Sequence, residues 1–223
     1  MRRNNLRKVG LLYMDKDLKF IIRSFLDFLM RSAYCVAGVL IMMLLAKIDI
    51  TRAGRITEIS FTEFTQEGLL FISAAIFLFL AKKKNSGGLL LVSGFLFCMF
   101  IRELDALFDM LFHGAWKYIA VAAAAGFSYA AWKKGKAETA RTLAEFMRTR
   151  SYGMLTRGLL VVLFISRLFG MRELGLFVAG VKFSENTKNF MEESTELLGY
   201  MLIFAAAVHY LKYCLRPSKN EEE

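Results

Sequence analysis

The sequence has few of the residues that interrupt helices or build transition-metal sites. Among its 223 residues there is one proline, Pro217, and there are two histidines, His113 and His209. Proline removes a backbone donor and ends helices, so a proline-free stretch up to residue 217 permits long uninterrupted helices. The three cysteines show no spacing typical of a zinc site or a disulfide framework. Zinc chemistry is therefore disfavoured, and long helices are expected.

Polar residues are also scarce for a soluble protein. Hydrophobic residues make up 56% of the chain, and its mean hydropathy is +0.42. A soluble domain needs more polar surface than this composition leaves. The formal net charge is +10. The basic residues lie between apolar segments, which is the pattern of a membrane protein, so no nucleic-acid partner is expected.

The apolar segments predict an all-α integral membrane bundle of about six transmembrane helices, since crossing the hydrocarbon takes about 20 residues at 1.5 Å each. Trp116 and Trp132 bracket the fourth segment about 24 Å apart, as tryptophans at the two membrane interfaces would. The six predicted spans cover residues 32–50, 64–81, 87–104, 116–132, 152–169 and 196–213.

Lysine and arginine set the expected orientation. If the N-terminus is inside, the inner segments carry about twenty of these residues and the outer ones about nine, which satisfies the positive-inside rule. Both termini are therefore expected in the cytoplasm and the protein in the inner (plasma) membrane. Residues 17–30 have a 3.6-residue apolar period, which predicts an N-terminal amphipathic helix. This helix would lie on the inner leaflet or pack against the bundle or a partner chain.

This topology divides the chain into three parts. Residues 1–31 form a basic cytoplasmic arm with the amphipathic helix, residues 32–213 the transmembrane domain, and residues 214–223 a cytoplasmic tail. The bilayer is the first partner, and the basic inner face suits anionic lipid or an acidic cytoplasmic protein. Small residues at 120–126 would let the fourth span approach a second copy or another membrane subunit closely.

Charged residues of four predicted spans fall at one depth, just inside the outer boundary. Measured from the cytoplasmic ends, each lies about 22 to 25 Å along its helix. An ionisable side chain at that depth is costly unless it is paired or faces a wet cavity. We therefore expect these side chains to converge: Glu67, Arg102, Glu103, Arg167 and Glu196.

A repeated motif adds further candidates. Phe61-x-Glu63-x-x-x-Glu67 precedes the second span, and Phe190-x-Glu192-x-x-x-Glu196 precedes the sixth. The two glutamates of each motif share one helical face. Ser60 before Glu63 also fits a helix-capping box, a purely structural role. Two further carboxylates of the outer segment could supply oxygen ligands, namely Asp105 and Asp109.

Three functions remain open for this layer. The first is non-enzymatic recognition of a cation or polar ligand by a sensor, a transport protein or an assembly subunit. The second is a carboxylate- and metal-dependent enzyme acting on a lipid head group, with a divalent cation held by Glu67, Glu103 and Glu196. The third is an arginine–glutamate ion-pair network that only fixes the register of helices in a scaffold.

Overall fold

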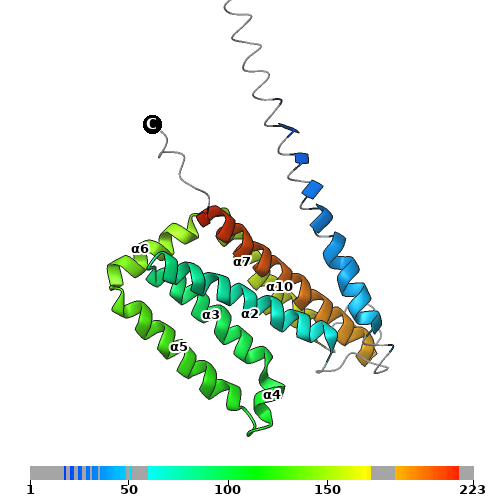
Figure 1. Ribbon diagram of the computed structural model, residues 1–223. Coiled ribbons are helices and arrows are strands. Elements are labelled where there is room, and N and C mark those ends of the chain that lie inside the picture. The colour runs from blue at the N-terminus through cyan, green and yellow to red at the C-terminus, as the bar shows by residue number, and fades with distance from the viewer. Residues whose placement is uncertain are drawn as a thin grey trace, which may run out of the picture. The chain divides into compact units, whose positions relative to one another are not determined.

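The computed structural model of the chain (Figure 1) describes residues 60–171 and 184–215. Before them it describes a smaller set of positions: 18, 21, 22, 25, 26, 29, 30, 32–34, 36–48 and 51. Every regular element in the described part of the chain is a helix, with no strand among those residues, which confirms the all-α class. By its contacts the chain divides into two compact units, 1–43 and 44–223.

The second unit holds the helices from α2 onward, most of which Figure 1 labels. In chain order they are α2 (Phe61–Lys83), α3 (Gly87–Glu103), α4 (Asp105–Asp109), α5 (Ala115–Lys133), α6 (Lys136–Met147), α7 (Arg150–Leu160), the π-helical turn η1 (Val161–Ile165), α8 (Ser166–Phe169) and α10 (Glu185–Leu215).

Short hydroxyl side chains begin several of these helices. The Ser60 hydroxyl accepts a hydrogen bond from the Glu63 N–H, which confirms the capping role expected for Ser60. Ser86 caps α3 and Thr149 caps α7 in the same way. Such caps satisfy backbone donors that have no partner within the helix. The helix starts are therefore encoded locally.

The core forms where α2 packs on α3 and α10, and α10 packs on α7. Several aromatic side chains pack together at the end of this core that lies near the C-terminal end of α10. Phe146 lies edge-on to Phe77, with ring centroids 5.3 Å apart, and to Tyr210 at 4.9 Å. Edge-on packing is a favoured arrangement of aromatic rings. The fully buried side chains of the core include Leu70, Leu80, Leu89, Leu96, Val162, Tyr200 and Ile203.

Among the residues that the structure describes, three helices are long and apolar enough to cross a membrane, as expected for a membrane protein: Phe61–Lys83, Arg150–Phe169 and Glu185–Leu215. The second of these comprises α7, η1 and α8. Six spans were expected. Of the other three segments, α3 has only 17 residues, Ser32–Ile48 is a shorter apolar helix, and α5, with 19 residues, is not among the helices apolar enough to cross. Of the predicted amphipathic helix, Ile21, Ile22 and Phe25 are helical and exposed. Much of residues 17–30 lies outside the described part, as do residues 172–183 and 216–223.

Glycine allows α7 and α10 to pack closely. A Cβ atom on Gly158 would lie 2.8 Å from the Gly199 carbonyl oxygen and 2.8 Å from Cγ1 of Ile203. Real Cβ contacts are longer, so the two backbones could not keep this spacing. On the same helix, a Cβ on Gly153 would meet nothing within 4 Å.

We predict that Gly158→Ala lowers the free energy of unfolding by about 1–3 kcal/mol, because the helices must separate. Gly153→Ala is the matched control, and it should leave stability unchanged or raise it by about 0.5–1 kcal/mol through helix propensity. Unfolding of both variants in detergent is the measurement. Equal stability of the two would contradict close packing at Gly158.

Candidate functional site

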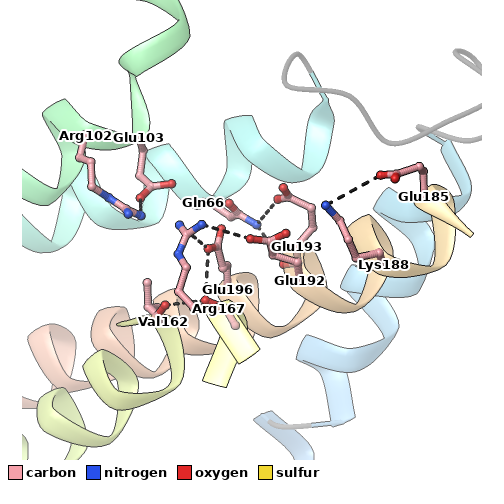
Figure 2. A network of polar contacts seen from close by, with 11 residues as sticks. Gln66, Arg102, Glu103, Val162, Arg167, Glu185, Lys188, Glu192, Glu193 and Glu196 are labelled. Atoms are coloured by element: carbon pink, nitrogen blue, oxygen red, sulfur yellow. Dashed lines mark hydrogen bonds and ion pairs between the residues drawn. The ribbon is translucent and has the colours of Figure 1, made fainter. Parts of the chain in front are cut away.

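Arg167 in α8 forms ion pairs with two glutamates of α10 (Figure 2). Its Nη1 lies 3.1 Å from Oε1 of Glu192, and its Nη2 lies 3.0 Å from Oε1 of Glu196. The Glu196 side chain is only 6% exposed, whereas that of Arg167 is 49% exposed. The arginine therefore spans from the solvent-accessible side of the helices to a buried carboxylate.

The π-helical turn η1 places this arginine. In a π-helix the backbone bonds join residues i and i+5, so the turn holds one residue more than an α-helical turn and rotates the helix after it. Directly after the turn come Ser166, which is fully buried, and Arg167. The Ser166 hydroxyl lies 3.2 Å from Oε1 of Glu196. Ser166 and Arg167 thus both contact the Glu196 carboxylate. π-helical turns are frequent at functional sites.

A second ion pair lies at the C-terminal end of α3. Arg102 lies in the last turn, where the helix dipole favours a cation, and its Nη2 is paired with Oε1 of Glu103. Glu103 lies within electrostatic reach of Glu67 on α2 and of Glu193 and Glu196 on α10. Figure 2 shows this pair beside the Arg167 pairs, with no dashed line joining the two groups.

A neutral contact ties α2 to α10 between these pairs. The Gln66 side-chain N–H₂ donates to both the Glu193 carbonyl oxygen and its Oε2, each at 3.0 Å. Gln66 is buried and Glu193 half-buried. The amide supplies hydrogen bonds but no positive charge. Gln66 therefore binds Glu193 without placing a positive charge beside it.

The seven charged residues that these contacts and electrostatic interactions bring together are called the carboxylate–arginine cluster below. They come from four helices, α2, α3, α8 and α10. The members are Glu67, Arg102, Glu103, Arg167, Glu192, Glu193 and Glu196. All of them except Glu193 were candidates from the sequence. Glu63 lies one turn before Glu67 on α2 and has its N–H capped by Ser60.

The described contacts do not join the other two candidates to the cluster. Asp105 is exposed on the short helix α4. Asp109 accepts hydrogen bonds from the Gly114 N–H at 2.8 Å and from Nδ1 of His113 at 2.9 Å. The hydrogen bond from Gly114, together with that from His113, lowers the pKa of Asp109. Asp109 therefore stabilises the turn that leads into α5.

Three site residues were missed from the sequence: Gln66, Ser166 and Glu193. Each is the direct sequence neighbour of a predicted charge, namely Glu67, Arg167 and Glu192. A helical spacing could have found one of them, since Glu193 and Glu196 are three residues apart and share a face of α10. Nothing in the sequence indicates the π-turn that brings Ser166 to Glu196.

The cluster carries an excess of negative charge. Five carboxylates face two guanidinium groups, so full ionisation leaves three charges uncompensated. The Glu67 side chain makes no hydrogen bond or ion pair with the described residues. Among those residues, no three acidic, histidine or cysteine side chains are placed to hold one metal ion together. This applies to Glu67, Glu103 and Glu196, the trio suggested for a divalent cation.

Comparison of the chain with protein-family models, with curated proteins and with solved structures gave no match. Inference about function therefore depends on the geometry and charge of the carboxylate–arginine cluster.

We predict that Arg167→Gln lowers the free energy of unfolding by about 2–3 kcal/mol, because it leaves the buried Glu196 carboxylate without its cation. Arg141→Gln is the control, since the pair of Arg141 with Glu138 is exposed and its loss should cost less than about 1 kcal/mol. Chemical unfolding in detergent measures both.

Adding Glu196→Gln to Arg167→Gln should restore much of the lost stability, because the uncompensated charge disappears. If the double variant is no more stable than Arg167→Gln alone, the buried charge is not the cause of the loss.

Proposed function

We propose that this chain is a multi-pass membrane protein whose carboxylate–arginine cluster recognises a cation or a cationic polar ligand, without catalysing a reaction. The observation that carries the proposal is the charge imbalance. A structural ion-pair network accounts for Arg167 with Glu192 and Glu196, and for Arg102 with Glu103. Within the described part of the chain, it leaves Glu67 and Glu193 without a cation at ion-pair distance.

Binding of an external cation would lower the free-energy cost of keeping these carboxylates ionised. Partly buried carboxylates lose hydration, and like charges close together raise the cost of ionisation further. A bound cation removes both penalties at once. Because the charges come from α2, α3, α8 and α10, a cation binding among them would also hold these helices together. Such coupling between binding and helix packing suits a sensor, a transport protein or an assembly subunit.

The topology proposed with this function has about six spans, with cytoplasmic termini in the inner membrane. The cluster lies near the N-terminal ends of α2 and α10 and the C-terminal ends of α3 and α8. Basic residues gather at the opposite ends of α2 and α10 and at the C-terminal end of α5: Lys82, Lys83, Lys133 and Lys212. The positive-inside rule puts this basic end in the cytoplasm and the cluster outside.

The proposed inside and outside can be tested by labelling. We expect a cysteine introduced by His113→Cys to react with a membrane-impermeant maleimide in intact cells, and one introduced by Lys134→Cys to react only after permeabilisation. The background variant has the three native cysteines replaced by serine. Labelling in the reverse order would overturn the orientation and place the cluster on the cytoplasmic side.

Cation recognition is tested on the full chain in detergent by following thermal unfolding with Na⁺, Ca²⁺, Mg²⁺, ethylammonium and spermidine. A cation at a hundred times its Kd should stabilise the protein by about 2.7 kcal/mol. Glu67→Gln should weaken that binding about tenfold, because it removes one unpaired charge close to the cation.

Glu145→Gln is the matched control. Glu145 is an exposed carboxylate on α6, paired with Arg141, and its loss should leave cation binding unchanged. If no cation in the set stabilises the protein, or if Glu67→Gln and Glu145→Gln behave alike, the cluster is a structural network only.

A further inference from the structure

Two turns of the chain meet at the C-terminal end of α2, the end opposite the carboxylate–arginine cluster. One turn joins α2 to α3, and the other joins α5 to α6 (Figure 1). The Lys134 ammonium group donates a hydrogen bond to the side-chain oxygen of Asn85. Next to this contact, the Gly88 N–H of α3 donates to the Thr142 hydroxyl of α6 at 3.0 Å. These hydrogen bonds hold the two turns against each other.

The two turns carry six exposed lysines, called the lysine patch below. The members are Lys82, Lys83, Lys84, Lys133, Lys134 and Lys136. None of them forms an ion pair with another described residue. Residues 68–102 and 110–137 contain no acidic residue. The next one, Glu138, is already bound by Arg141 through hydrogen bonds of 2.9 and 3.1 Å.

Exposed aromatic side chains border the lysine patch on the same two helices. On α5, Trp132 is 59% exposed and Tyr129 is 55% exposed. The Lys133 ammonium group lies 4.8 Å from the centre of the Tyr129 ring. On α2, Phe79 lies one turn before Lys83 and is 52% exposed. Tryptophan and tyrosine concentrate where a membrane meets water, because their rings are apolar but carry a polar group.

We propose that the lysine patch binds the phosphate groups of anionic phospholipids. Because α2 is long and apolar enough to cross a membrane, its last turn reaches the level of the lipid head groups. The lysines pair there with the phosphates, and the three aromatic side chains contact the apolar part of the same lipids. The patch lies at the other end of α2 from Glu67, so lipid binding is independent of the proposed cation recognition.

The aromatic side chains favour a lipid over a soluble acidic partner. An acidic protein or a nucleic acid would pair with the lysines but offer nothing to the apolar rings of Phe79, Tyr129 and Trp132. A phospholipid matches both features, because its phosphate is joined to apolar chains. Lysine also suits this position, since its long stem lies along apolar surface while the ammonium group extends to the phosphates. Basic residues at this level attract anionic lipids electrostatically.

The two tryptophans of the chain give a matched measurement on one helix. Trp132 lies beside the lysine patch, and Trp116 lies in the first turn of α5. Trp116→Phe leaves only Trp132, and Trp132→Phe leaves only Trp116. Each full-length variant is reconstituted into vesicles of phosphatidylcholine and phosphatidylglycerol in equal parts. Bromine on the acyl chains of one lipid or the other then quenches the tryptophan in proportion to how often that lipid lies next to it.

We expect phosphatidylglycerol to lie next to Trp132 about fivefold more often than phosphatidylcholine, the effect of one basic residue at a membrane surface. Next to Trp116 the two lipids should be equal, because the only lysine there, Lys117, lies within electrostatic reach of the Asp109 carboxylate. Equal quenching of Trp132 by the two brominated lipids refutes the lipid site, and so does a preference of the same size at Trp116.

Lys84→Gln and Lys136→Gln together, in the Trp116→Phe protein, should remove most of the preference at Trp132. Both side chains are exposed, so the variant should fold normally. Lys117→Gln is the control on the same background, and it should keep the preference. Equal loss in the two variants refutes the patch and shows an effect of net charge alone. If the double variant does not fold, the comparison of the two tryptophans decides.

Two further outcomes identify a different occupant. If an excess of soluble glycerophosphoglycerol removes the preference at Trp132, the patch takes a free phosphate compound and not a membrane lipid. If the vesicles show no preference, and the protein in detergent binds polyglutamate while the double lysine variant does not, the partner is an acidic protein. Either result overturns the lipid site.

Discussion

The ion pair between Arg167 and Glu196 is the interaction on which the arrangement of the site depends. A carboxylate that is only 6% exposed among apolar helices needs a cation at contact distance, and Arg167 supplies it at 3.0 Å. The pair joins α8 to α10. It thereby holds both helices in the rotation that turns Glu192 and Glu196 of α10 toward Arg167. The positions of these α10 side chains relative to α2 and α3 depend on this alignment.

The bundle has two ends with different chemistry. Toward the C-terminal end of α10 the packing is aromatic and apolar, with Phe77, Phe146 and Tyr210 in contact. Toward its N-terminal end the packing is polar and only partly compensated in charge. Low local stability is typical of binding regions, because a site that must accept a ligand cannot also satisfy all its own groups. The ion pairs of Arg167 and Arg102 lie at this polar end.

The convergence of charge could be predicted from depth alone. Counting helical rise from the basic ends places Glu67, Arg102, Glu103, Arg167 and Glu196 at one level. The structure pairs Arg167 with Glu196 and Arg102 with Glu103, and it puts Glu67 within electrostatic reach of Glu103. Depth does not specify direction around a helix, however. The partners Gln66 and Glu193 could not be chosen from the sequence, because their contact depends on the rotation of α2 against α10. Asp105 and Asp109 follow the C-terminal end of α3 but lie on a short helix, and the described contacts do not join them to the cluster.

The sequence by itself determined the helical class, the apolar character of the long helices, their capped starts and the separation of basic from acidic ends. These properties arise from composition, periodicity and local hydrogen bonding, which act within a few residues. Only the tertiary structure decided which charged side chains form pairs. The π-turn at Val161–Ile165 and the glycine contact between Gly158 and Gly199 set the rotation and spacing of α7, α8 and α10. Both depend on packing between segments far apart in the chain, so no local pattern encodes them.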